Sequence, residues 1–248
     1  MGDFNTISFD QSRENAQRKF LSATYGWMAL ALLISAAASF LTATLIGMTL
    51  TGNAQHDSAV LSGYSMTILI LAIGEIGLVW WLSASIRNIS VKAAVIGYTV
   101  YSILNGVTLS SIFFVYQLGS IGTIFISCAG MFGVMALYGL KTKSDLRKAG
   151  KYLMMALIGI IIASVVNSLI TLFTRNPVGP LDWLISIATV VVFAGLTAYD
   201  SQKLLSISGS ADGSDAYKKI SIIGALELYM DFINMFLALL RLFGRRRD

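Results

Sequence analysis

Seven hydrophobic runs, each about as long as a membrane span, constrain this chain more than any other feature. An α-helix needs about 20 consecutive apolar residues to cross a bilayer. The connections between the runs are short, which is typical of one compact bundle. We therefore expect an all-α integral membrane protein with seven transmembrane helices. The runs cover residues 20–47, 64–84, 93–115, 120–140, 152–174, 181–206 and 220–243.

The composition excludes a soluble domain and several kinds of site. Hydrophobic residues make up 56% of the chain and charged residues only 12%, whereas soluble domains average about 25% charged residues. The single cysteine, Cys128, excludes an intramolecular disulfide and, with only one histidine in the chain, argues against a zinc site. We interpret Cys128 as a small core residue. The net charge of +5 comes from basic loops, so we expect no nucleic-acid partner.

The distribution of basic residues predicts the orientation. We divide the chain into a cytoplasmic N-terminal arm (1–19), a seven-span membrane domain (20–243) and a basic tail (244–248). The positive-inside rule places the basic loops in the cytoplasm, so the N-terminus is predicted to be cytoplasmic and the tail exterior. The arm and alternate loops hold thirteen Lys and Arg residues, whereas the opposite loops hold only Arg175: Arg13, Arg18, Lys19, Arg87, Lys92, Lys141, Lys143, Arg147, Lys148, Lys151, Lys203, Lys218 and Lys219.

The tail is the exception to this pattern, because Arg245, Arg246 and Arg247 fall on the exterior if the last run crosses. The alternative is a last segment that re-enters and returns. We favour crossing, since the 24 residues of 220–243 are ample. The short tails and the absence of an organellar leader lead us to expect a bacterial inner (plasma) membrane and contact with its lipids.

Small residues predict where the helices pack, because apolar burial gives little net drive within lipid. The first span carries Ala31, Ser35, Ala38 and Thr42 on one helical face, and the fourth carries Gly130 and Gly133. The lone histidine, His56, is expected to be a solvated residue of the outer loop between the first two spans.

The last run carries a polar stripe. Glu227, Asp231, Asn234, Ala238 and Arg241 follow the i, i+4, i+7, i+11, i+14 spacing of one helix face. A charge exposed to hydrocarbon costs several kcal/mol. The stripe must therefore face protein or water, which makes this helix an interior element of the bundle and the first place to look for function.

Two acids on neighbouring spans, Asp200 and Asp231, could meet in the cytoplasmic half of the membrane. Asp231 lies about 16 Å along the helix from residue 220. Two touching carboxylates cannot both ionise cheaply, so the pair would share a proton and, when deprotonated, offer hard oxygen ligands to Ca²⁺. The alternative is structural: Asp200 would pair with Lys203 or Arg87, and Asp231 would hydrogen-bond Asn234 or a tyrosine.

Two further acids lie within the spans. Glu227, one turn from Asp231, either extends the acidic pocket or is capped by Ser221 or Tyr229. Glu75 is either a packing hydrogen-bond acceptor or an acid that lines a pore.

At these residues a family resemblance becomes specific. Residues 226–241, Leu-Glu-Leu-Tyr-Met-Asp-Phe-Ile-Asn-Met-Phe-Leu-Ala-Leu-Leu-Arg, resemble the C-terminal signature of the transmembrane Bax inhibitor motif family, and Ala-Tyr-Asp-Ser-Gln at 198–202 resembles its penultimate-helix motif. The resemblance implies six helices around a central seventh and a pH-sensitive calcium leak closed by a di-aspartyl pair. Asp200 and Asp231 match the pair. Arg87 stands in for an arginine that competes for one carboxylate, although residues 83–87 do not reproduce the family's basic cluster.

The leading hypothesis is a pH-sensitive calcium leak channel gated by Asp200 and Asp231, with calcium ions and protons as its ligands and no other cofactor. The alternative is a regulatory protein that binds another membrane protein or a membrane protease, with structural acids. An enzyme is not expected, because no Ser/His, HExxH or GxGD constellation is present.

Overall fold

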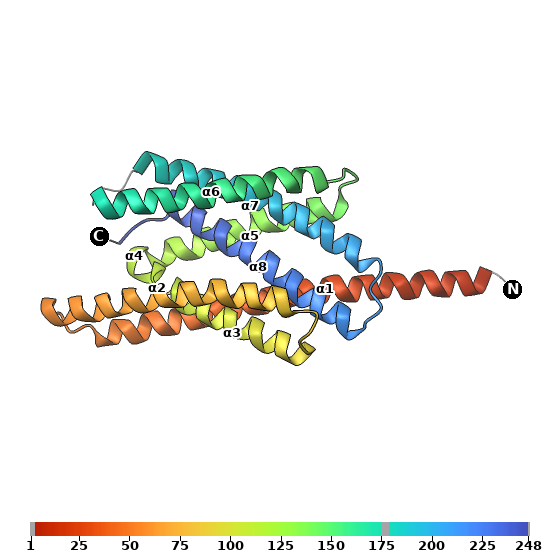
Figure 1. Cartoon of the computed structure of the whole chain (residues 1–248), viewed down its shortest axis with the longest axis horizontal. Coiled ribbons are helices and arrows are strands. Elements are labelled where there is room, and N and C mark those ends of the chain that lie inside the picture. Colours follow the sequence, from red (N-terminus) through yellow and green to blue (C-terminus); the bar gives the residue numbers. More distant parts are fainter. Residues whose placement is uncertain (1–2, 175–178, 248) are drawn as a thin grey trace. The chain divides into compact units, whose positions relative to one another are not determined.

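The structure is a computed structural model that describes residues 3–174 and 179–247, with side chains from residue 14 onward. Arg175 and the side chain of Arg13, which entered the charge count, lie outside this part. The described part is helical, with no β-strand (Figure 1). Its helices are α1 (Asp3–Thr49), α2 (Ala54–Ser85), α3 (Val91–Leu109), α4 (Ile112–Val115), α5 (Leu118–Lys141), α6 (Arg147–Thr174), α7 (Gly179–Ser208) and α8 (Asp215–Phe243).

Seven helical segments are long and apolar enough to cross a membrane, as the hydrophobic runs predict. The third of them combines α3 with the short α4. The N-terminal arm is not a separate element, because α1 continues through it from Asp3.

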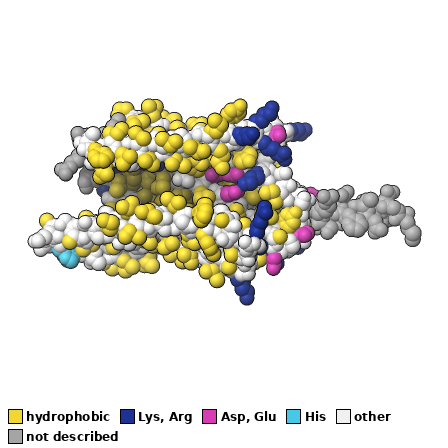
Figure 2. All heavy atoms as spheres, viewed as in Figure 1, with side chains coloured by type: hydrophobic (Ala, Val, Ile, Leu, Met, Phe, Trp, Pro, Cys, Tyr) yellow, Lys and Arg dark blue, Asp and Glu magenta, His cyan; other side chains and the backbone are white. Residues whose placement is uncertain are grey.

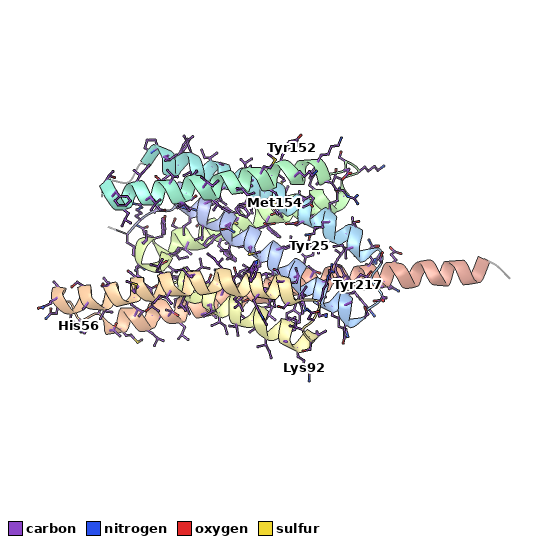
Figure 3. All side chains as sticks on the ribbon, viewed as in Figure 1. Tyr25, His56, Lys92, Tyr152, Met154 and Tyr217 are labelled. Carbon is purple, nitrogen blue, oxygen red and sulfur yellow. The ribbon has the colours of Figure 1, made fainter. Side chains whose placement is uncertain are left out.

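The start of α2 differs from the prediction by ten residues, and His56 is an exposed residue of the first helical turn rather than of a loop (Figure 3). The Asn53 side chain accepts hydrogen bonds from the backbone N–H groups of Gln55 and His56. The Asp57 carboxylate accepts from the N–H groups of Thr51 and Gly52 at 2.9 and 3.0 Å. These bonds satisfy donors that a helix start leaves free, so the helix begins within the polar segment.

The helices divide into two compact units. Unit 1 contains α1 to α4 and the first part of α8, up to Leu226. In it α3 packs on both α1 and α2. A Cβ at Gly106 of α3 would lie 2.5 Å from the carbonyl oxygen of Ser35 and 2.7 Å from the Cβ of Ala38. The Ser35 hydroxyl donates to the carbonyl of Ser102 at 2.7 Å. The stripe of small residues on the first span is thus confirmed as a packing surface.

The first turns of α8 are tied into unit 1 by polar contacts. The hydroxyls of Thr24 and Ser221 lie 2.9 Å apart, and the Tyr98 hydroxyl donates to the carbonyl of Ala225 at 3.3 Å. Hydroxyl groups that bond across helices are a common means of association in lipid.

Unit 2 contains α5, α6, α7 and α8 from Glu227 onward. Here α7 packs on both α5 and α6. The two units therefore share one pattern, in which three consecutive spans pack through the third, as an internal three-plus-three repeat would. α8 contributes to both units and is the most buried of the described spans. In its most apolar stretch of 18 residues 72% of the residues are buried, whereas in the corresponding stretch of α6 none is buried. This burial is what the expected central position of the last helix requires.

Two details of unit 2 test the packing predictions. Cys128 is completely buried and its sulfur lies 3.7 Å from the carbonyl oxygen of Phe232, so its interpretation as a core residue is confirmed. The prediction for Gly130 and Gly133 is wrong, because no described atom lies within 4 Å of a Cβ built at either position. The close approach occurs instead at Gly139, where a Cβ would collide with the carbonyl of Ala198.

Candidate functional site: a buried carboxylate pair

The structure brings Asp200 of α7 and Asp231 of α8 together in unit 2. Their carboxyl groups lie within hydrogen-bonding reach of each other. Both are buried, with 9% of Asp200 and 5% of Asp231 exposed. The pairing that the sequence suggests for two neighbouring spans is thus realised by the helix packing of one unit.

A hydrogen bond between two carboxyl groups requires a proton, because an ionised carboxylate can only accept. Oδ2 of Asp231 is buried and accepts no hydrogen bond from an N–H or O–H group of the described residues. A buried acceptor without a partner is costly. The arrangement therefore suits a group that holds a proton or meets a transient cation.

A lysine and a third acid complete the cluster. Lys203 lies one turn after Asp200 on α7, and its Nζ donates to both carboxylate oxygens of Glu227 at 2.9 Å. The same Nζ lies 3.9 Å from Oδ1 of Asp200. Glu227 thus has a cationic partner and lines the same cavity as the pair, which agrees with the first of its two predicted roles, an extension of the acidic pocket. With one shared proton on the pair, Asp200, Asp231, Glu227 and Lys203 carry a formal charge of −1, and without it −2.

The cluster lines a cavity of about 650 Å³ in unit 2. The predicted polar stripe faces this cavity, since Glu227, Asp231, Asn234 and Arg241 all line it. Its α6 wall is apolar over most of its length and includes Met154 (Figure 3). Basic side chains gather where α5 connects to α6, at one end of the unit (Figure 2).

Asn234 does not serve the pair as a hydrogen-bond donor. Its side-chain amide donates to the carbonyl of Met230, one turn earlier on α8, at 2.8 Å. The alternative in which Asn234 satisfies Asp231 is therefore absent from the structure, and Asn234 contributes only to the polar lining of the cavity.

Residues next to Asp200 explain how α7 is positioned. A Cβ at Gly150 of α6 would lie 2.5 Å from the ring of Tyr199, so only glycine lets α6 come this close. The Gln202 side chain accepts from the N–H of Leu146 and donates to the carbonyl of Ser144, both at 2.8 Å. These bonds fasten the α5–α6 connection to α7, one turn from the carboxylate pair.

The other predicted site residues, Glu75 and Arg87, belong to unit 1. Glu75 accepts hydrogen bonds from the amide of Asn105 at 2.8 Å and from the hydroxyl of Thr108 at 3.0 Å. These bonds agree with the interpretation of Glu75 as a packing hydrogen-bond acceptor. Arg87 follows the end of α2, and its carbonyl accepts from Lys219 Nζ at 2.9 Å. Its action on a carboxylate of the pair stays a prediction.

The predicted calcium ligands are the carboxylates of Asp200 and Asp231. Within the described ranges, no three His, Cys, Asp or Glu side chains are grouped so as to hold a metal ion. Ca²⁺ in a stable site takes six to eight oxygen ligands.

Sequence reasoning missed the bond from Lys203 to Glu227 and the roles of Gln202, Gly139 and Gly150. A signal for Lys203 was present, because a lysine three residues after a buried acid shares its helix face. No local signal distinguishes the packed glycines from Gly130 and Gly133, since the difference lies in the neighbouring helix.

Comparison with known proteins agrees with the motifs at this site. Residues 17–248 match the family model Bax1-I, described as inhibitor of apoptosis-promoting Bax1. The chain is 42% identical over 230 residues to inner membrane protein YbhL of Escherichia coli K12, covering 92% of each chain. It is 40% identical to an uncharacterized protein of Borreliella burgdorferi, covering 94% of each. It is 35% identical to uncharacterized protein RP147 of Rickettsia prowazekii, covering 98% of this chain and 96% of that one. This chain is a membrane protein of the Bax inhibitor family.

Proposed function

We propose that the protein is a proton-regulated calcium leak channel of the bacterial inner membrane, in which Asp200 and Asp231 form the gate. The observation that carries the proposal is the buried carboxyl of Asp231, which lies within hydrogen-bonding reach of the Asp200 carboxyl and accepts no hydrogen bond at Oδ2 from a described N–H or O–H group. The name of the E. coli relative, an inner membrane protein, and the seven apolar helices support the location.

The chemistry of the pair supports regulation by protons. With one shared proton, a hydrogen bond between the carboxyls links α7 to α8. Loss of that proton leaves two negative charges in a medium of low dielectric, where they repel each other strongly. The helices must then separate or a cation must enter. A change in proton concentration thus becomes a change in helix contact.

The charge of the cluster supports a cation as the permeating species. Glu227 and the pair outnumber Lys203, so this cluster of four side chains stays negative in both protonation states of the pair, while Arg147, Lys151 and Arg241 line other parts of the cavity. Carboxylate oxygens are the ligands that Ca²⁺ prefers. Conduction also requires that an ion bind weakly enough to leave, and a site with few protein ligands meets this requirement.

Flux through purified protein tests the proposal directly. Protein in phosphatidylcholine vesicles that contain a calcium-sensitive dye should pass Ca²⁺ at a rate that depends on pH. Asp200→Asn and Asp231→Asn should each flatten that dependence, because asparagine keeps the shape of the side chain but cannot titrate. Asp182→Asn removes a carboxylate from the first turn of the same helix, α7, and should leave the pH profile unchanged.

Two outcomes would refute the proposal. Vesicles that pass no Ca²⁺ at any pH would favour the alternative function, a regulator of another membrane protein or protease. Flux whose pH dependence survives in both variants would reduce the pair to a helix-packing contact. Circular dichroism and size-exclusion chromatography of each variant establish that the fold is retained.

A further inference from the structure

A second cavity, of about 620 Å³, lies within unit 1. Its walls come from the N-terminal half of α1, the first turns of α3, the α7–α8 connection and the first turns of α8, where Tyr217 lies (Figure 3). None of the described residues that line it also lines the cavity of the carboxylate pair. It is therefore a separate site, and no part of the proposed channel function uses it.

The wall of this cavity changes from polar to apolar along α1. Asn15 and Lys19 line one end, and Phe20 and Trp27 line the wall beyond them. Trp27 lies twelve positions after Asn15, which is about 18 Å along the helix. On the facing wall Val95 of α3 is apolar as well. An occupant that matches both ends has a polar head and an apolar body about as long as this wall.

The polar end favours a negatively charged head. Two lysines, Lys19 and Lys218, line the cavity against one carboxylate, Asp212. Lys218 is paired with Asp215 at 2.8 Å, but both side chains are more than half exposed, so the pair holds Lys218 only weakly. In the part of the chain that is described, no carboxylate forms an ion pair with Lys19.

The remaining charges near the cavity are already engaged. The Asp212 carboxylate accepts from the backbone N–H of Ser214 at 2.8 Å. Its hydrogen bonds to Ser214 hold the pKa of the Asp212 carboxyl below its usual value, so Asp212 is ionised at neutral pH and repels an anion at its own corner of the cavity. Lys219 donates to the carbonyls of Arg87 and Ile89 at 2.9 and 3.1 Å. The anion therefore belongs between Lys19 and Lys218.

We propose that this cavity binds one anionic phospholipid of the surrounding leaflet, with its phosphate between Lys19 and Lys218 and an acyl chain along Phe20, Trp27 and Val95. The volume lies within the range of about 300–1,000 Å³ of ligand pockets. Basic pockets between transmembrane helices are a recurrent form of anionic lipid site. Lys19 directly precedes the first hydrophobic run, so the head group lies at the membrane surface.

Trp27 provides a direct reporter of occupancy. The chain has four tryptophans, so W80F, W81F and W183F together leave Trp27 as the only fluorophore of its kind. In phosphatidylcholine vesicles, brominated phosphatidylglycerol should quench Trp27 at a lower mole fraction than brominated phosphatidylcholine. Lys19→Gln and Lys218→Gln should each weaken this preference roughly fivefold, the usual effect of one lysine on binding to an anionic lipid.

Two controls keep the test specific. Lys92→Gln removes the same charge from an exposed position at the start of α3 (Figure 3), which does not line the cavity, and should preserve the preference. Ala23→Trp, made with phenylalanine at the three tryptophan positions other than 27, fills the cavity without a charge change. Its bound lipid is read by native mass spectrometry. It should lower the amount of retained phosphatidylglycerol even if a lysine variant fails to fold.

Three results would overturn the proposal. The first is equal quenching by the anionic and the zwitterionic lipid, which would indicate only the general lipid layer. The second is a preference that survives in both lysine variants. The third is full relief of quenching by aqueous glycerol 3-phosphate, which would assign the site to a soluble phosphate compound instead of a lipid. All three readouts are independent of ion flux.

Discussion

Lys203 determines how much negative charge the carboxylate pair encounters. Its ammonium group bonds both oxygens of Glu227 at 2.9 Å and lies 3.9 Å from the nearer oxygen of Asp200. Glu227 therefore acts on the pair both through its own charge and through its hold on the lysine. Removing that acid changes both effects in the same direction.

Glu227→Gln should shift the midpoint of pH-dependent flux to lower pH, by about one unit. The variant removes a negative charge from the neighbourhood of Asp231. It also removes the carboxylate that holds Lys203, so the positive charge of Lys203 acts more strongly on Asp200. Both changes favour the deprotonated pair, and one pH unit corresponds to about 1.4 kcal/mol. The measurement is vesicle Ca²⁺ flux across a pH series at two calcium concentrations.

Lys203→Met is the matched variant of opposite sign and should shift the midpoint to higher pH. Methionine keeps an unbranched side chain but removes the cation. A midpoint that stays in place in both variants would mean that the charges of Glu227 and Lys203 do not influence the protonation of the carboxylate pair.

Two glycines on α5 differ in what they face. Gly139 of α5 lies against the backbone of Ala198 on α7, just before Asp200 in the chain, whereas Gly130 faces open space. The contact at Gly139 involves backbone atoms, which cannot turn aside as a flexible side chain can. The approach of α5 to α7 therefore depends on the missing Cβ.

Gly139→Ala should destabilise the protein by about 1–3 kcal/mol, the usual cost of overpacking a close contact. It should also lower the rate and sharpness of the pH response, since α7 carries Asp200. The measurement is thermal unfolding in a fixed detergent, followed by circular dichroism. Gly130→Ala is the control on the same helix, and an equal loss of stability in the two variants would contradict the packing of α5 on α7.

α8 is long enough to cross the membrane. It is a continuous helix of 29 residues, which is about 43 Å long and exceeds the roughly 30 Å of a hydrocarbon core. A re-entrant segment needs a break, and none interrupts Asp215–Phe243. The tail after it is fastened to the start of α5, where the Gln117 N–H donates to the carbonyl of Arg245 at 2.9 Å.

Reporter fusions placed after Lys151 and after Asp248 should therefore report opposite sides of the membrane. The positive-inside rule predicts a cytoplasmic position for the first, and a crossing α8 would put the second outside. Alkaline phosphatase and green fluorescent protein fusions make the measurement, because each is active on one side only. Cytoplasmic signals from both positions would replace the seventh span by a re-entrant segment and leave the arginines of the tail inside.

Local sequence sufficed to predict the seven spans and the polar stripe of the last one, because hydropathy and helical spacing are properties of neighbouring residues. It also identified Asp200 and Asp231, since an acid within an apolar run stands out without reference to the fold. The start of α2 is also encoded locally, by the capping residues Asn53 and Asp57. It lies before the hydrophobic run, so the hydropathy pattern did not reveal it.

Which polar groups meet depends on how the helices pack. The bond between Lys203 and Glu227 joins residues 24 positions apart on two helices, and the fastening of the α5–α6 connection by Gln202 spans more than 50. Gly130 and Gly139 are alike in sequence and differ only in the helix opposite them. Such contacts depend on how helices approach each other, and that approach is set by the sum of many distant packing interactions rather than by any local pattern.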